Sequence, residues 1–195
     1  MLTRVTENVS RRITEPKALR ALSHPTRWEI VDLLGSELKA TATRCADVTG
    51  ESVASCSYHL GMLAKYGFVE PAEGGEGREK PWKLVTRHRR FDMEGQDQEG
   101  QLAVEALSEV FIDYQAAQQK AFVRRASRES TEWRRSTGSW STTTYMTSAE
   151  LAEVTAEYEA ICARYRDRIA DPSLRPAGSR PVRLHLTSWL PRPPD

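Results

Sequence analysis

The chain has few cysteines and no long apolar run among its 195 residues. Its three cysteines, Cys45, Cys56 and Cys162, form no C-x-x-C pair and leave an odd one out, which indicates a reducing compartment rather than a disulfide framework. No segment approaches the roughly 18 consecutive apolar residues of a membrane span, and the first residues lack the apolar stretch of a secretory signal. We therefore expect a cytoplasmic protein with no membrane partner.

Catalytic and cofactor-binding motifs are also missing. The sequence contains no G-x-S-x-G, no G-x-x-x-x-G-K-[ST] phosphate loop and no G-x-G-x-x-G after a strand. The G-G-E-G run at 74–77 lacks both the preceding buried strand and the following helix that phosphate binding requires. The histidines show no H-x-x-H or H-E-x-x-H spacing; they are His24, His59, His88 and His185. These absences predict a protein that is not an enzyme and carries neither a metal nor a cofactor.

The composition is that of a folded chain with an uneven charge. Hydrophobic residues make up 39% and charged residues 28%, which is enough to bury a core. Residues 1–90 carry 15 Lys and Arg against 11 Asp and Glu, whereas residues 91–195 carry 13 against 16. The front half is therefore the better candidate for binding a polyanion, although many solvated surfaces are equally basic.

Helical periodicity organises the first fifty residues. Apolar residues at steps of three and four predict a short helix over residues 1–16, either a dimer arm or a frayed tail, that ends at Pro16. Two further helical pieces follow, the second with Pro25 in its first turn and Gly35 at its end. Thr41 or Thr43 is expected to cap a short third helix, because a threonine oxygen accepts from the free amides of the first turn.

A longer helix and a hairpin come next. Residues 52–66 are predicted to form a helix capped by Ser52, with Gly67 in the left-handed position after it. The period then changes, and two extended runs around a tip of glycines and charges predict a β-hairpin over residues 70–86. Helix, turn, helix and hairpin in this order are typical of a winged helix-turn-helix DNA-binding domain, here spanning residues 17–90.

The helix 52–66 has two chemically different faces. At about 100° per residue, an apolar sector is expected to face the core; it holds Val53, Cys56, Leu60 and Leu63. The opposite sector is small, polar and basic, and it suits a major groove because hydroxyls bond base edges and an alanine methyl contacts thymine. A merely solvated face is the alternative. The predicted DNA-binding residues are Ser52, Ala54, Ser55, Ser57, Tyr58 and Lys65 on the helix, with Arg78 and Lys80 in the wing.

Three stretches resemble one known family. The runs A-L-R-A-L-S-H-P-T-R-W-E-I-V-D-L-L, C-S-Y-H-L-G-M-L-A-K-Y-G-F-V-E and G-R-E-K-P-W look like the opening helices, recognition helix and wing of ArsR-type transcriptional regulators, over residues 17–86. The resemblance implies recognition-helix contacts at Ser55, Ser57 and Tyr58, a cap at Ser52 and a wing contact at Arg78. It also implies a dimer on a pseudo-palindromic operator, usually a repressor that an inducer releases.

One departure from the family bears on metals. Metal-sensing members carry paired cysteines in the first helix of the helix-turn-helix, or His and Asp ligands on a C-terminal helix. Here the matching region is T-R-C-A-D-V, with one cysteine. We interpret Cys45, Cys56 and Cys162 as small core residues rather than ligands.

The back half is expected to hold two copies together. A polar linker over residues 91–100 precedes a helix over 101–125 with a narrow apolar stripe. This stripe is the predicted homodimer interface, with packing inside the same chain as an alternative or an addition; its residues are Val104, Leu107, Phe111 and Tyr114.

The last segment is expected to form a strand, a helix and a strand over residues 140–190. It brings together several aromatic side chains, as the lining of a small-molecule effector pocket or as plain core; they are Trp133, Trp140, Tyr145, Tyr158, Tyr165 and Trp189. The predicted fold is therefore mainly α with small β. A winged helix-turn-helix domain is followed by a C-terminal helical or α+β dimerisation and effector module over residues 101–195.

These observations predict a sequence-specific, double-stranded DNA-binding transcriptional regulator, a dimeric repressor of the ArsR type. The helix 52–66 reads the major groove and the wing 70–86 reaches the backbone or the minor groove. The alternative is a winged-helix module that binds protein without contacting DNA. The two differ in salt dependence, because only phosphate contacts make the affinity fall steeply as salt rises.

Overall fold

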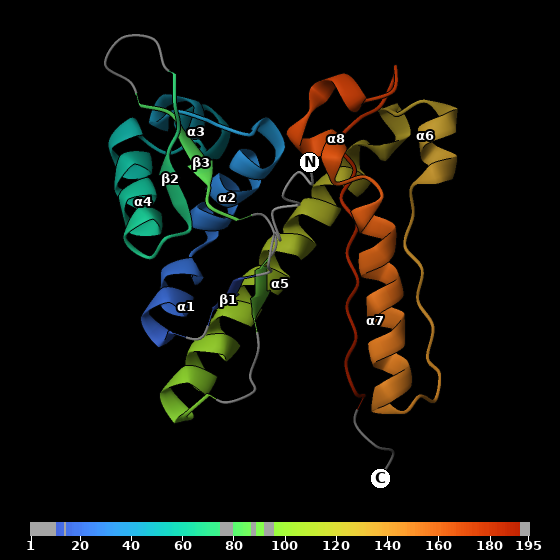
Figure 1. Cartoon of the computed structure of the whole chain (residues 1–195). Coiled ribbons are helices and arrows are strands. Elements are labelled where there is room, and N and C mark those ends of the chain that lie inside the picture. Colours follow the sequence, from blue (N-terminus) through green and yellow to red (C-terminus); the bar gives the residue numbers. More distant parts are fainter. Residues whose placement is uncertain (1–10, 14, 75–79, 87–88, 92–95, 192–195) are drawn as a thin grey trace, which may run out of the picture. The chain divides into compact units, whose positions relative to one another are not determined.

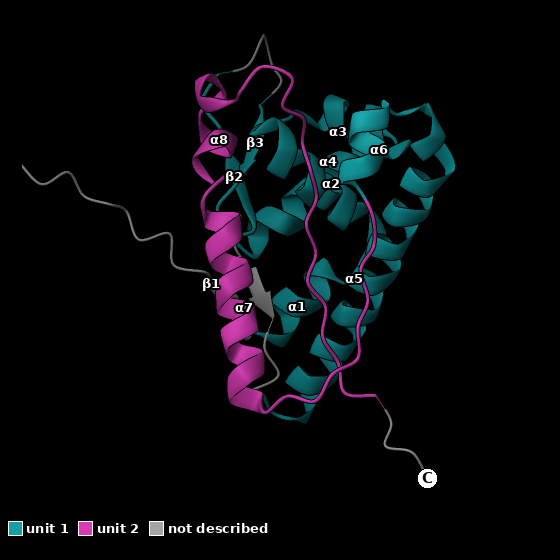
Figure 2. Cartoon of the chain, turned by 90° about the vertical axis from the view of Figure 1, so that its right-hand side faces the viewer, with its two compact units in different colours: residues 1–137 teal, residues 138–195 magenta. Residues whose placement is uncertain are grey.

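The computed structural model describes residues 11–13, 15–74, 80–86, 89–91 and 96–191. The chain divides into two compact units, residues 1–137 and 138–195 (Figure 2). Helices predominate and every strand has three residues. This confirms a mainly α fold with little β structure.

The first unit contains most of the regular structure, drawn from blue to olive in Figure 1. Its elements follow in this order: β1 (Arg11–Ile13), α1 (Pro16–Leu22), α2 (Pro25–Glu37), α3 (Ala42–Thr49), α4 (Val53–Lys65), β2 (Val69–Pro71), β3 (Trp82–Leu84), β4 (Arg89–Phe91), α5 (Gln98–Arg125), the 3-10 turn η1 (Ala126–Arg128) and α6 (Thr131–Ser136).

Local sequence signals account for the helix boundaries in this unit. Pro25 lies in the first turn of α2, where its missing N–H costs nothing. The Thr41 hydroxyl accepts from the Arg44 amide at 3.2 Å and caps α3. Gly50, at φ 74°, ends α3 in the left-handed conformation that glycine adopts without strain. The sequence therefore predicts the helix-turn-helix boundaries correctly.

The hairpin is confirmed as well. Strands β2 and β3 pair in antiparallel fashion, with Val69 opposite Leu84 and Pro71 opposite Trp82. The loop between α2 and α3 joins this sheet, because the amides of Ala40 and Trp82 donate to each other's carbonyls at 3.0 and 2.8 Å. This bridge fixes the base of the wing to the helix-turn-helix.

The core lies where α1, α2, α3, α4 and α5 meet. Trp28, Phe68 and Tyr114 contribute aromatic rings to this core. The most deeply buried side chains are aliphatic or thiol; they are Leu19, Leu22, Ile30, Leu34, Cys45, Cys56, Leu60, Leu63, Val69 and Leu107. Burial of this many apolar side chains supplies the main stabilisation of the unit, at about 1.5–3 kcal/mol for each large side chain.

Helix α5 packs on α1 and α2 of the same chain. Val104, Leu107 and Tyr114 are buried there, and Phe111 packs its ring 4.7 Å from that of Trp28. The stripe expected to join two copies is thus covered within the chain by α1 and α2. The helix also begins at Gln98, inside the expected linker, and shares the first unit with the helix-turn-helix.

Two local expectations in the front half were wrong. Gly35 does not end α2, which continues to Glu37 and stops at Leu38 with φ 72°. A Cβ on Gly35 would lie 3.8 Å from Leu84 Cδ1, an ordinary van der Waals distance, so the helix continues past this glycine beside β3. Residues 11–13 form β1, which pairs in parallel with β4 rather than continuing a helix. Residues 1–10 and 14 of the expected helix lie outside the described residues.

The second unit contains α7 (Ser148–Ala163), α8 (Asp167–Ala170) and the 3-10 turn η2 (Pro172–Leu174). A capping box starts α7, since Thr147 Oγ1 accepts from the Glu150 amide while the Glu150 carboxylate accepts from the Thr147 amide. The expected strands on either side do not form among the described residues 138–147 and 175–191. The alternating run 182–190 leaves its apolar residues exposed, so no neighbouring strand stabilises it.

We expect Tyr114→Phe to lower the free energy of unfolding by about 1–2 kcal/mol, because it deletes a hydrogen bond to a carboxylate. The Tyr114 hydroxyl donates to Asp32 Oδ2 at 2.7 Å, and burial raises the pKa of this tyrosine to about 12. Urea unfolding followed by circular dichroism measures the change. Tyr145→Phe is the control, since Tyr145 is fully exposed. Equal stability of the two variants would contradict the role of the bond.

Candidate nucleic-acid interface

Helix α4 separates an inner and an outer face, as the sequence predicted. Cys56, Leu60 and Leu63 are fully buried. The expected recognition residues lie on the other side: Tyr58 is 61% exposed. Ser52, Ala54, Ser57, Gly61 and Lys65 are exposed, and Ser55 is half-buried. One helix therefore anchors itself in the core and offers a hydroxyl-rich surface to solvent.

The N-terminus of α4 is well formed. Ser52 Oγ accepts from the Ser55 amide at 3.1 Å, which satisfies one of the free amides of the first turn. The remaining amides carry the positive end of the helix dipole, an environment that favours a phosphate. Ser52 thus shapes the N-terminal end of α4.

The inner face differs from the prediction at two positions. Val53 was expected in the core, but it is 45% exposed. His59 is buried instead, at the edge of the buried face opposite to Val53. The buried face of α4 is therefore rotated toward His59 relative to the face that its apolar residues alone predict. Val53, in the first turn, lies at the edge of this buried face.

His59 belongs to a small cluster that joins α4 to the start of α2. Its ring lies 4.6 Å from the ring of His24, centroid to centroid. Arg27 Nε donates to His59 Nδ1 at 3.4 Å, and Arg27 Nη1 donates to the Ala21 carbonyl at 2.5 Å. Since Nδ1 accepts in this geometry, His59 is neutral with its proton on Nε2.

Burial and a neighbouring cation keep both imidazoles neutral. Burial lowers the pKa of His24, and the guanidinium of Arg27 lowers it further. Burial likewise lowers the pKa of His59, followed by the charges of His24 and Arg27. Glu51 acts in the opposite direction on both. Sequence reasoning missed this cluster because His24 and Arg27 meet His59 only when α2 and α4 pack together.

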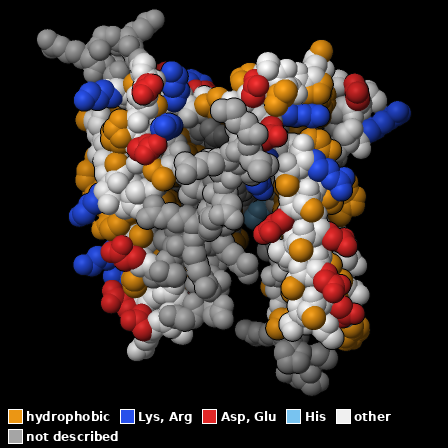
Figure 3. All heavy atoms as spheres, viewed as in Figure 1, with side chains coloured by type: hydrophobic (Ala, Val, Ile, Leu, Met, Phe, Trp, Pro, Cys, Tyr) orange, Lys and Arg blue, Asp and Glu red, His pale blue; other side chains and the backbone are white. Residues whose placement is uncertain are grey.

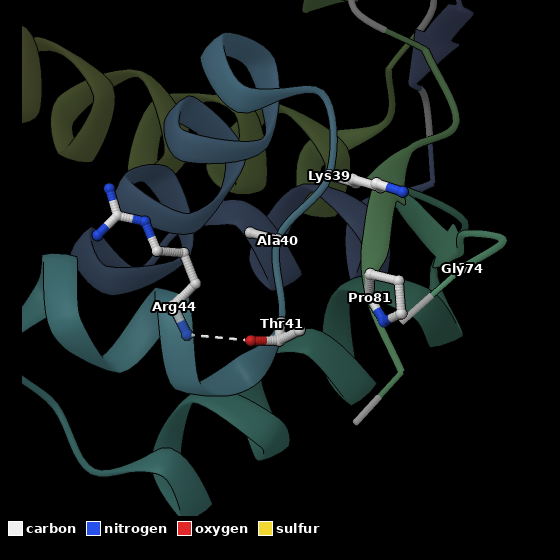
Figure 4. Close-up of a pocket in the computed structure, with 6 residues that line it drawn as sticks. All are labelled: Lys39, Ala40, Thr41, Arg44, Gly74 and Pro81. Atoms are coloured by element: carbon white, nitrogen blue, oxygen red, sulfur yellow. Dashed lines mark hydrogen bonds between the residues drawn. The ribbon is translucent and has the colours of Figure 1, made fainter. Parts of the chain in front are cut away.

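A shallow hollow of about 270 Å³ lies at the base of the wing, beside the start of α3 (Figure 4). Its lining includes Lys39 and Arg44 on the helical side, and Gly74 and Pro81 on the hairpin side. Lys39 Nζ donates to the Glu73 carbonyl at 3.3 Å, and Arg44 forms a two-pronged ion pair with Glu37 at 2.6–3.2 Å. Hydrophobic periodicity does not predict that Lys39 and Arg44 meet at this hollow, because Lys39 lies in a loop and Arg44 on an exposed helix face.

The wing is described only in part. Lys80 is exposed next to β3. Arg78, the expected wing contact, lies outside the described residues, as do the neighbouring tip residues 75–79.

The aromatic residues expected to line an effector pocket differ in their exposure. Trp140, Tyr145 and Trp189 are strongly exposed, and Tyr165 is exposed as well. Trp133 and Tyr158 are half-buried. Shallow hollows lie at the wing base and near residues 15–17 and 64–67, both in the first unit.

Two of the three cysteines lie in the core, as expected. Cys45 and Cys56 are buried free thiols, and burial raises the pKa of Cys45 to about 12. Cys162 is half-buried. Within the described ranges, His, Cys, Asp and Glu do not gather into a group of three that could hold a metal. No helix in those ranges is both long and apolar enough to cross a membrane.

Comparison with known proteins identifies one domain. A family model described as a helix-turn-helix domain matches residues 22–72, which contain α2, α3, α4 and β2. No curated protein matches the chain. The chain therefore contains a helix-turn-helix domain, a module typical of DNA-binding regulators.

The histidine cluster predicts acid-sensitive stability. A histidine whose pKa is lower in the folded state than its ordinary value of 6.5 binds its proton mainly after unfolding. Stability is then complete above pH 6.5 and falls as the pH decreases through the lowered folded pKa. We expect His24→Asn/His59→Asn to flatten this dependence in urea unfolding at stepped pH.

His185→Asn is the matched control, because His185 is exposed in the second unit. It should retain the acid sensitivity of the unchanged chain. If the double variant loses stability below pH 6.5 as steeply as this control does, the cluster is not its source.

Proposed function

We propose that this helix-turn-helix chain is a dimeric, sequence-specific, double-stranded DNA-binding transcriptional regulator, a repressor of the ArsR type. The observation that carries the proposal is the orientation of α4, whose apolar row is buried while its hydroxyl-rich row is exposed. In a helix-turn-helix, the second helix enters the major groove and the first crosses the backbone. Here those helices are α4 and α3.

The exposed row of α4 has the chemistry that base reading needs. Ser55, Ser57 and Tyr58 carry hydroxyls that donate to and accept from base edges, and the Ala54 methyl suits a thymine methyl. Gly61 adds no side chain where the helix would approach the duplex. Its surroundings are open, because no atom of the chain lies within 4 Å of the position that a Cβ would take. Lys65, at the far end, is placed for a phosphate.

Phosphate contacts would come from both sides of α4. In the proposal, the capped start of α4 and the cations near the wing, Lys39, Arg44 and Lys80, follow the backbone, and Arg78 contacts the flanking backbone. Such contacts give affinity and register, whereas the α4 hydroxyls give selectivity.

A dimer follows from the size of α4. Its 13 residues span about 20 Å, which is enough for a few base pairs only. Two copies separated by about one helical turn of DNA double the recognised sequence. The resemblance to ArsR-type regulators supports the same arrangement and adds release by an inducer.

The competing function is a protein-binding winged helix without DNA contact. It requires an apolar exposed surface on α4, because protein interfaces concentrate aromatic and apolar side chains at their centre. The exposed row of α4 has Tyr58 as its one aromatic residue among serines, alanine and glycine. That composition favours DNA.

We expect Tyr58→Ala to weaken operator binding about tenfold or more while the fold is retained. The operator is first obtained by sequencing genomic fragments that co-purify with the protein, and affinity is measured by gel-shift titration. Tyr145→Ala, at a fully exposed tyrosine of the second unit, is the matched control. Unchanged affinity of Tyr58→Ala would remove α4 from the groove.

Variants of the wing should behave differently. We expect Arg78→Ala and Lys80→Ala to reduce the affinity for operator and random DNA by similar factors and to lower the salt slope by about one each. Fluorescence anisotropy at several salt concentrations measures both quantities. A loss confined to the operator would contradict a phosphate role, and affinity that does not depend on salt would favour the protein-binding alternative.

A further inference from the structure

The second unit has exposed apolar surface and no core of its own. Among its described residues, 138–191, none is buried. Large hydrophobic side chains are exposed along its helices and extended segments; they include Trp140, Val154, Ile161, Ile169, Leu184 and Trp189. Ordering a chain of this length costs conformational entropy that only burial of apolar surface offsets. The unit therefore needs a partner surface.

Helix α7 presents the best-defined part of the apolar surface, which we name the α7 seam: the exposed Val154 and Ile161 together with the half-buried Leu151 and Tyr158. Steps of three and four place these residues on one side of the helix, the spacing that packs against another helix. The same helix is strongly acidic, with four glutamates and no lysine or arginine between Ser148 and Ala163. Figure 3 shows hydrophobic and acidic side chains together on its visible face.

The first unit contains a surface of opposite charge, which we name the basic arm: residues 120–135, from the last turns of α5 through α6. It carries six lysines and arginines against two glutamates. No residue of α5 after Tyr114 is buried, so these turns project beyond the core. Val123 is exposed there, and Phe122 and Trp133 are half-buried, which gives the arm an apolar strip among its cations.

We propose that the α7 seam of one chain docks on the basic arm of a second copy, and that the exchange joins two copies into a dimer. The proposal rests on the dimer of the proposed function. Its physical basis is complementarity: an apolar helix face flanked by four carboxylates meets an apolar strip flanked by six cations. Two α7 helices would instead bring like charges together.

The topology of the chain permits the exchange. Eleven residues, 137–147, connect α6 to α7, and extended chain of this length spans up to about 36 Å. In a two-fold dimer the contact forms twice, so each copy both donates a seam and receives one. The stripe of α5 that was expected to pair is occupied by α1 and α2, which leaves the arm as the part of α5 open to a second copy.

Charge reversal tests this directly. The acidic variant set is Glu153→Lys/Glu157→Lys on α7, and the basic variant set is Arg124→Glu/Arg128→Glu on the arm. Glu150 is left unchanged because it completes the capping box. Sedimentation equilibrium of the full chain without DNA measures association, and each double reversal is expected to raise the dimer dissociation constant about tenfold or more.

Mixing the two variants supplies the decisive comparison. A reversed seam matches a reversed arm, and the unchanged seam matches the unchanged arm, so the mixture restores both contacts of a heterodimer. We expect the dissociation constant of the mixture to return to within about threefold of that of the unchanged protein. Glu105→Lys, an exposed reversal in the first half of α5, is the control and should leave association unaffected.

The outcomes separate this interface from the proposed function. A monomeric unchanged chain, a dimer insensitive to both reversals, or a mixture that stays dissociated would each overturn the interface. In parallel, a gel shift of the unchanged protein on operator DNA reports on DNA binding alone. A dimer that responds as expected but does not bind DNA would overturn the proposed function and leave the interface standing.

Discussion

The attachment of α4 to the core determines which residues of this helix face solvent. Cys56, Leu60 and Leu63 have no exposed surface, so the rotation of the helix about its own axis is fixed by packing against its neighbours. That rotation alone decides that Ser57 and Tyr58 face solvent. A shift of one residue in the packing register would rotate α4 by about 100° about its axis. That rotation would bury hydroxyl groups that have no hydrogen-bond partner in the core. The composition of the exposed face of α4 is therefore set by how the apolar core packs.

The same packing extends from α1 to α5 and makes one mechanical body of the first unit. The Arg27, His24 and His59 cluster joins α4 to the turn before α2, while the bond from Tyr114 to Asp32 joins α2 to α5. Both connections are polar and partly buried, so they favour one arrangement over near alternatives. The cluster depends on neutral imidazoles, which links the position of the recognition helix to pH.

Sequence reasoning succeeded where the signal is local. The Ser52 cap, the first-turn Pro25 and the left-handed Gly67 each act within a few residues, and all were predicted; of the two candidates for the α3 cap, Thr41 is the one that caps. Sequence reasoning failed where contacts between distant segments determine the structure. The pairing of β1 with β4 and the burial of His59 in place of Val53 follow from tertiary contacts that periodicity does not encode. The run 182–190 alternates like a strand, but strands need neighbours.

The central claim, that the exposed row of α4 lies in the major groove, is tested most directly by methylation protection on an operator fragment. Dimethyl sulfate modifies guanine N7 in the major groove and adenine N3 in the minor groove. We predict protection of guanine N7 in two clusters separated by about one helical turn of roughly 10 base pairs. Bound protein that leaves every guanine N7 reactive, or that protects adenine N3 alone, would contradict the account.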